Sequence, residues 1–206
     1  DQALSVRKAP LGVCALFVAA LSLVVAVLLS VFLLATPTPA SAEDGLFAGG
    51  TGSETDPYQI ANADQLKNLA DQVNAGSAQY ATAHYALPAN IDLADSKFTS
   101  TNARIGYADN FKHASTHGFR GTFDGRGFTI RNLTLDLSKL TFTGSMYTAG
   151  LFGATQDATI RNLNLQSVTL SETLPSTVVS DKGADAALGC LVGAAYGSTT
   201  IEKCSV

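Results

Sequence analysis

Two aspartate-containing segments are the first places to look for enzyme chemistry. Asp124 lies in Phe123-Asp124-Gly125-Arg126-Gly127, and Asp92 is followed closely by Asp95. Enzymes that cleave sugar chains need paired carboxylates at a defined separation, or a calcium site with a basic residue. However, Asp-Gly also favours a tight turn, and Asp92 and Asp95 follow a predicted strand and face a loop. No carboxylate cluster recurs along the chain, so we expect no catalytic residues.

A pair of histidines is the next candidate for chemistry. His113 and His117 have the i, i+4 spacing of two zinc ligands on a helix. No Glu follows His113, and the residues between and after them, 114–116 and Gly118, are typical of a loop. A serine nucleophile of the Gly-x-Ser-x-Gly type is also absent from the sequence. We therefore expect exposed loop histidines, no metal site and no cofactor.

The N-terminal segment, 1–42, has the features of an export signal. Arg7 and Lys8 precede an uncharged apolar run over positions 11–35, and Ala40-Ser41-Ala42 has the small-x-small pattern of a cleavage site. We predict a signal peptide over residues 1–42. Because the run is long enough to span a membrane, which takes about 20 residues, an uncleaved signal anchor is the alternative. Both interpretations place residue 43 onward outside the cytoplasm and leave the membrane in contact only with this N-terminal segment.

The remaining residues, 43–206, are mildly acidic. Without Asp1, Arg7 and Lys8, the chain's 13 basic and 17 acidic residues become 11 and 16, a net charge of −5. The absence of a basic stripe argues against nucleic acid as a partner. Only two cysteines, Cys190 and Cys204, follow residue 42, so the chain is not a disulfide scaffold.

One amphipathic helix is predicted at about residues 63–75. Asn62 is the candidate N-cap, and Gln65 completes a capping box. Apolar residues then recur with helical spacing at Leu66, Leu69, Ala70 and Val73. We expect this to be the only helix after residue 42. Short strands are predicted around it at Tyr58-Gln59-Ile60, Tyr85-Ala86-Leu87, Ile91-Asp92-Leu93 and Phe119 to Phe123.

An internal repeat dominates the rest of the chain. Thr129-Ile130-Arg131-Asn132-Leu133-Thr134-Leu135 returns at positions 159–165 and again, more distantly, at positions 200–206. A repeat of this size predicts a solenoid in which each unit buries its apolar face against its neighbours. The last residues alternate apolar and polar, which is typical of strands. We expect Leu133, Leu163 and Cys204 to occupy equivalent inward positions in successive coils.

A second repeated element precedes the later copies. Residues 149–153 read Ala-Gly-Leu-Phe-Gly, and residues 189–193 read Gly-Cys-Leu-Val-Gly. Asp136–Ala149 and Thr169–Ala187 are predicted to be projecting loops of variable length, which explains the unequal spacing of the repeats.

These segments resemble the GLUG motif, whose consensus is close to Gly-Leu-aliphatic-Gly. The likeness extends to residues 49–60, to Asn90-Ile91-Asp92-Leu93 and to residues 119–130, so that it covers about residues 46–206. The second motif departs from it at Cys190, where the first Gly is expected. The resemblance implies a right-handed parallel β-helix of bacterial surface and adhesin-like proteins, also found in the non-catalytic region of IgA-protease-type metalloproteases. It brings no catalytic residues.

We therefore expect a mainly β chain. Residues 43–206 form a right-handed parallel β-helix with an N-terminal capping α-helix, truncated at the C-terminus. The expected function is an extracellular structural or adhesive module of a bacterial cell-surface protein, secreted and attached at the surface, which binds a host or cell-surface glycan or protein. The alternatives are a β-helix polysaccharide lyase or hydrolase and the non-catalytic arm of a surface metalloprotease. Cys190 and Cys204 serve different strands, so we expect free thiols.

Overall fold

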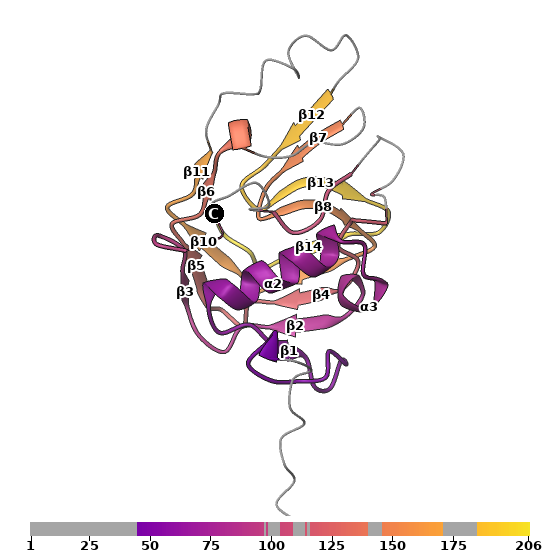
Figure 1. Ribbon diagram of the computed structural model, residues 1–206, viewed down its shortest axis with the longest axis vertical. Helices are drawn as coiled ribbons and strands as arrows, with labels where there is room; N and C mark the ends of the chain where they lie inside the picture. The colour runs from indigo at the N-terminus through magenta and orange to yellow at the C-terminus, as the bar shows by residue number, and fades with distance from the viewer. Residues whose placement is uncertain are drawn as a thin grey trace, which may run out of the picture. The chain divides into compact units, whose positions relative to one another are not determined.

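The computed structural model describes residues 45–96, 98, 104–108, 114, 116–139, 146–170 and 185–206 (Figure 1). All of them belong to residues 40–206, the second of the two compact units into which the chain divides. The predicted signal segment, residues 1–42, lies outside the described residues. Within the described ranges, no helix is both long enough and apolar enough to cross a membrane.

The described part of the chain is mainly β, with parallel strands in small sheets and few helices (Figure 1). The largest sheet has the order β1-β2-β4-β9-β14. Parallel neighbours cannot be joined by a tight hairpin, so between successive strands of this sheet the chain passes through helices or through strands of other sheets. The strands of this sheet are β1 (Tyr58–Gln59), β2 (His84–Ala86), β4 (Thr122–Asp124), β9 (Thr159–Arg161) and β14 (Thr200–Glu202).

Four smaller sheets have the orders β10-β5-β3, β11-β6, β12-β7 and β13-β8, all with parallel pairing. Their strands are β3 (Ile91–Asp92), β5 (Thr129–Arg131), β6 (Thr134–Leu135), β7 (Met146–Ala149), β8 (Phe152–Gln156), β10 (Asn164–Gln166), β11 (Thr169–Leu170), β12 (Asp185–Leu188) and β13 (Val192–Tyr196).

The middle residues of the largest sheet form one column that points into the core. Tyr85 lies opposite Phe123, which lies opposite Ile160, which in turn lies opposite Ile201. Side chains alternate between the two faces of a strand, so the flanking residues of each strand point outward. The first three members of the column are almost fully buried.

The predicted helix is confirmed as α2 (Ala63–Asn74). Asn62 Oδ1 accepts a hydrogen bond from Gln65 N at 3.0 Å. Gln65 Oε1 in turn accepts from Ala61 N at 2.7 Å, so the capping arrangement reaches one residue before the N-cap. The predicted apolar face is buried in the main core.

The expectation of a single helix is wrong. A four-residue helix, α3 (Ala78–Ala81), follows α2, and a 3-10 helix, η3 (Leu137–Lys139), follows β6. Both are too short to show the 3.6-residue periodicity by which a helix is recognised in a sequence.

The first two repeat copies do not stack on one another as predicted. Ile160 in the second copy lies opposite Phe123, whereas Ile130 in the first copy lies opposite Leu165. The copies therefore belong to different sheets. The second and third copies do stack, since Ile160 lies opposite Ile201.

This register shows which of the three residues predicted to be equivalent, Leu133, Leu163 and Cys204, occupy matching positions. Ser205 N donates to Leu163 O at 3.0 Å, which places Leu163, two residues after β9, and Cys204, two residues after β14, in equivalent positions. Leu133 instead precedes β6, and its carbonyl accepts from Thr169 N at 2.8 Å. Leu133 is buried, but it is not the partner of Leu163.

The two glycine-rich segments do lie side by side. Leu151 N donates to Cys190 O at 3.0 Å, and Phe152 N donates to Leu191 O at 2.8 Å. The strands that flank them, β7 with β12 and β8 with β13, are also paired. Both predicted loops are therefore shorter than expected, because their ends belong to strands. Their central parts, 140–145 and 171–184, lie outside the described residues.

Candidate functional site

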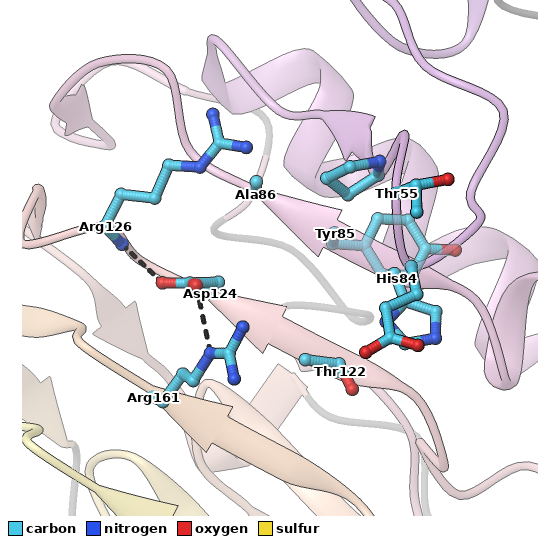
Figure 2. Close-up of a pocket in the computed structure, with 10 residues that line it drawn as sticks. Thr55, His84, Tyr85, Ala86, Thr122, Asp124, Arg126 and Arg161 are labelled. Carbon is cyan, nitrogen blue, oxygen red and sulfur yellow. Dashed lines mark hydrogen bonds and ion pairs between the residues drawn. The ribbon is translucent and has the colours of Figure 1, made fainter.

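A cavity of about 190 Å³ lies beside β2, β4 and β9. Figure 2 shows Asp124 between Arg126 and Arg161, with Thr55 and His84 on the other side of the cavity. Asp124 and Thr122 reach it because Phe123, between them, points into the core. The lining residues are Glu54, Thr55, Pro57, His84, Tyr85, Ala86, Thr122, Asp124, Arg126 and Arg161.

The Asp124 carboxylate is held by three donors, two of them from β9 and the turn that follows it. Oδ2 accepts from Arg161 Nε at 3.0 Å. Oδ1 accepts from Asn162 Nδ2 at 3.0 Å and from Arg126 N at 2.9 Å. We call this group, Asp124 with Arg126 N, Arg161 and Asn162, the Asp124 cluster. It joins two neighbouring strands of the largest sheet, β4 and β9. We call the stretch of chain from one strand of this sheet to the next a pass, so the cluster links residues that are one pass apart in the sequence.

The turn predicted at Asp124-Gly125 lies slightly later, over residues 125–128, and Asp124 itself is the last residue of β4. Phe128 N donates to Gly125 O at 2.8 Å, and Arg126 and Gly127 have positive φ values of 51° and 81°. Gly125 itself is needed for another reason. A Cβ atom on it would lie 2.5 Å from the carbonyl oxygen of Asn162, so only glycine allows this close approach.

These contacts determine the protonation state of Asp124. Partial burial by itself would raise the pKa of this carboxyl group. The hydrogen bonds from Asn162, Arg126 N and Arg161, together with the guanidinium charge, outweigh that effect and lower the pKa below its ordinary value. A general acid needs a pKa raised toward neutrality. Asp124 is therefore an ionised structural group rather than a proton donor.

The cavity presents two exposed charged residues of opposite sign, Arg126 and Glu54. The Arg126 guanidinium is exposed, and Figure 2 shows it pointing away from Asp124, which is contacted by the Arg126 backbone. Tyr85 also lines the cavity, but its hydroxyl donates to Tyr80 O at 2.7 Å, and burial raises its pKa. The arrangement offers charged and polar groups that can contact a polar ligand.

Asp92 is held in the same way one pass earlier. Its Oδ2 accepts from Arg131 Nε at 2.9 Å, and its Oδ1 accepts from Asn132 Nδ2 at 2.7 Å and from Ala94 N at 3.0 Å. We call Asp92, Ala94 N, Arg131 and Asn132 the Asp92 cluster. The bonds from Asn132, Ala94 and Arg131 lower the pKa of Asp92, against a small opposing effect of burial.

A second, more open cavity of about 510 Å³ borders this cluster. Asp92 and Asp95 both line it, together with the start of α2 at Asn62, Ala63 and Asp64. Asp92, which the sequence predicts to face a loop, is instead engaged by the neighbouring strand. Of the two aspartates of this cavity, Asp92 is thus held by donors of the protein itself.

The prediction of exposed loop histidines is wrong for His117. His117 is half-buried: its ring stacks on Tyr107 with centroids 4.6 Å apart, and its Nδ1 lies 3.0 Å from Asn74 O. His113 lies outside the described residues. In the part of the chain that the structure describes, no group of three His, Cys, Asp or Glu side chains could hold a metal ion.

Cys190 and Cys204 are both free and half-buried. The Cys204 thiol donates to Glu202 O at 3.3 Å and, more weakly, to Ile160 O at 3.7 Å. Cys204 packs against the main core, as expected for a small apolar residue at the position that corresponds to Leu163.

Sequence reasoning missed the partners of the aspartates. A signal was present: apolar-Asp occurs at 91–92 and 123–124, and Arg-Asn occurs at 131–132 and 161–162. It also missed Arg104, which is only 5% exposed, donates from Nη1 to Thr148 O at 3.0 Å and lies 5.4 Å from the Tyr107 ring centroid. Burial lowers the pKa of Arg104 to about 10.

Comparison with known proteins gives one partial similarity. Over 116 residues the chain is 31% identical to halomucin of Haloquadratum walsbyi (strain DSM 16790 / HBSQ001). The match covers 56% of this chain, but the chain spans only about 1% of the length of halomucin. No family model matches the chain. No solved structure matches it significantly.

Proposed function

We propose that residues 43–206 form a right-handed parallel β-helix of the GLUG type that serves as an extracellular structural or adhesive module of a cell-surface protein. The observation that carries the proposal is the pairing register. Each inner strand of the largest sheet pairs in parallel with strands one pass earlier and one pass later, and the inward residue is replaced by another apolar residue each time. A chain that winds repeatedly through the same sheets has this register.

The glycine-rich segments support the GLUG part of the proposal. A Cβ atom on Gly193 would lie 2.6 Å from Ala149 O and 2.8 Å from Gly153 O. A Cβ atom on Gly153 would lie 2.4 Å from Gly106 O. Glycine is therefore required at the same place in two successive passes, where backbone meets backbone. A motif that ends in glycine would be repeated for this physical reason.

The arrangement of α2 supports a capping role. Asn74 Nδ2 donates to Arg104 O, and Asn74 Oδ1 accepts from Gly106 N, both at 2.9 Å. Ile105, between these residues, pairs with Phe152 of β8. The C-terminal end of α2 thus lies against Ile105, the residue that pairs with β8 on the side opposite β13. There the helix covers apolar core that would otherwise be exposed.

The state of the aspartates favours a non-enzymatic module over a polysaccharide lyase or hydrolase. Asp92 and Asp124 each accept three hydrogen bonds from their own protein and have lowered pKa values. Neither is available as a general acid. The halomucin match is compatible with an extracellular surface module, for the part of the chain that it covers.

The fold can be tested by cross-linking in a Cys190→Ser, Cys204→Ser background. Thr122 lies opposite Thr159 in the register, so the Thr122→Cys, Thr159→Cys variant should form an intramolecular disulfide on oxidation. The matched control is Thr129→Cys, Thr159→Cys, which joins the positions that the sequence repeat alone would align. A bridge in the control and none in the first variant would refute the winding.

The function can be tested with the secreted chain immobilised on beads and exposed to cell-surface polysaccharides and host proteins. We expect binding to at least one of them. Because the projecting loops predicted from the sequence are the proposed contact surface, replacing residues 140–145 and 171–184 by short Gly-Ser links should abolish the binding. Cleavage of an offered polysaccharide would support the enzyme alternative and overturn the proposal, as would the absence of any binding.

A further inference from the structure

The Asp124 cluster leaves part of the Arg161 side chain unused. Arg161 contacts Asp124 only through Nε, at 3.0 Å. In the other cluster, Arg131 contacts Asp92 through both Nε, at 2.9 Å, and Nη2, at 2.8 Å. The terminal nitrogens of Arg161 make no hydrogen bond within the part of the chain that the structure describes, and Figure 2 shows them turned away from Asp124, on the side of Thr122. Their N–H groups can therefore donate to a ligand.

The Arg126 side chain is not needed by the cluster either. Only the backbone of Arg126 takes part, since its N–H donates to Asp124 Oδ1 at 2.9 Å. At the same place in the Asp92 cluster stands Ala94, whose N–H donates to Asp92 Oδ1 at 3.0 Å. An alanine is therefore sufficient for this structural task. The Arg126 guanidinium lines the cavity, is exposed and forms no ion pair with any described residue.

These two arginines give one end of the cavity a positive charge. Figure 2 shows Asp124 between Arg126 and Arg161. The ionised Asp124 offsets one of the two positive charges, so one remains. Both oxygens of Asp124 already accept hydrogen bonds from the protein, so this end offers donors rather than acceptors. A guanidinium can bind a planar carboxylate through two parallel N–H···O bonds.

The other end of the cavity offers groups that suit hydroxyls. Thr55 and His84 lie there (Figure 2), and Glu54 precedes Thr55 on the same loop and also lines the cavity. A backbone hydrogen bond of 3.0 Å from Thr51 N to Asp56 O closes this loop. A carboxylate, a threonine hydroxyl and an imidazole can each exchange a hydrogen bond with a sugar hydroxyl.

The size of the cavity limits what it can hold. Its volume of about 190 Å³ is below the roughly 300–1,000 Å³ of pockets that enclose a drug-sized ligand. It therefore suits one small residue, and the exposed side chains of Glu54, Thr55 and Arg126 let a longer chain continue into solvent. An α-amino acid fits less well, because its ammonium group needs several acceptors and the oxygens of Asp124 are already engaged.

We propose that this cavity binds one carboxylate-bearing sugar residue, a hexuronate, of an acidic polysaccharide. The terminal nitrogens of Arg161 and the Arg126 guanidinium donate to the carboxylate of the sugar. Glu54 and His84 contact its hydroxyls at the other end, and Asp124 is a positioning residue that fixes Arg161. The inference does not involve residues 140–145 and 171–184, so it stands separately from the adhesive role assigned to them.

The test is a titration of the secreted chain with a galacturonate trimer, followed through the amide chemical shifts. The ligand control is the methyl ester of the same trimer, which keeps the rings and removes the charge. We expect saturable shift changes at residues 84–86 and 122–126. The ester should bind about tenfold more weakly or worse, because hydrogen bonds to a charged group are stronger than those to a neutral one.

An Arg126→Ala change should weaken binding of the trimer by about tenfold. Its urea unfolding midpoint should stay close to that of the wild type, because the backbone donor to Asp124 remains. The matched control is Arg131→Ala, which removes the same charge outside the cavity and should leave the affinity for the trimer unchanged. A chain with short Gly-Ser links in place of residues 140–145 and 171–184 should bind the trimer like the wild type.

Four results would overturn the proposal. The first is the absence of saturable binding up to about 10 mM trimer. The second is equal affinity for the acid and the ester. The third is an equal loss of affinity in Arg126→Ala and Arg131→Ala, which would show general charge attraction. The fourth is loss of binding in the chain with the replaced segments, which would assign the trimer to those segments instead of the cavity.

Discussion

Removing the Asp124 carboxylate tests the view that this residue is structural. An Asp124→Ala change deletes the acceptor of three hydrogen bonds, from Arg126 N, Arg161 Nε and Asn162 Nδ2. A hydrogen bond contributes about 0.5–1.5 kcal/mol net, and a half-exposed ion pair no more than about 1 kcal/mol. Because the Arg161 side chain is 43% exposed, its hydrogen bond and ion pair contribute at the low end of these ranges. The free energy of unfolding should therefore fall by about 2–3 kcal/mol in total.

The matched comparison is Asp92→Ala. The Asp92 cluster has the same three kinds of donor, but its carboxylate is 41% exposed, against 21% for Asp124. Water replaces lost bonds more easily at the more exposed site, so Asp92→Ala should destabilise the protein less than Asp124→Ala. Exposure is thus the variable that the comparison isolates.

Urea unfolding followed by far-UV circular dichroism measures both variants against the wild type. For a domain of this size the Asp124→Ala loss corresponds to a drop in Tm of roughly 4–12 °C. A loss below about 0.5 kcal/mol for Asp124→Ala would refute the reasoning. An Asp92→Ala variant that loses as much stability as Asp124→Ala would refute it as well.

Four other outcomes are expected. Leu163→Ala should cost about 2–5 kcal/mol in urea unfolding, since Leu163 is 0% exposed, and a wild-type midpoint would contradict its place in the core. Because the folded-state pKa of Asp124 is lowered, its stabilisation is complete above about pH 4 and is lost as the pH falls through the folded-state value, so Asp124→Asn should weaken the acid dependence of unfolding. Thiol titration of the denatured, unreduced protein should find both Cys190 and Cys204 reactive, and a mass two daltons low would contradict this. N-terminal sequencing of the secreted protein should begin at Glu43, whereas an intact membrane-bound chain would favour the signal anchor.

The sequence predicted local structure well and the stacking register poorly. The capped helix and the short strands around Tyr85, Ile91 and Ile160 were recognised because capping and alternation are local signals. The register was mistaken because residues 129–132 and 159–162 are both Thr-Ile-Arg-Asn. Each copy buries its isoleucine and uses Arg-Asn to hold an aspartate on the preceding strand. The same local task arises on two different sheets, so similarity of sequence did not indicate equivalence of position.

The candidate site was only half predicted. The turn next to Asp124 was expected because Asp-Gly is a strong local signal, although Asp124 itself ends β4 and the turn covers residues 125–128. Its partners Arg161 and Asn162 were not identified, because they meet it only after the chain has made a further pass. His117 was misjudged for the same reason: its contacts with Asn74 and Tyr107 come from other parts of the chain.

The long sequence separation between paired strands has a mechanical consequence. Phe123 and Ile160 are neighbours in the ladder, and so are Ile160 and Ile201, although a whole pass of the chain separates the members of each pair. Each pass thus adds only about 4.8 Å along the stacking direction. If a pulling force peels off one pass from the β14 end, about 40 residues are released, and these can extend by about 130 Å. Under tension the module would therefore unfold one pass at a time instead of all at once. Each step would break only a few hydrogen-bonded strand pairs but would lengthen the chain considerably.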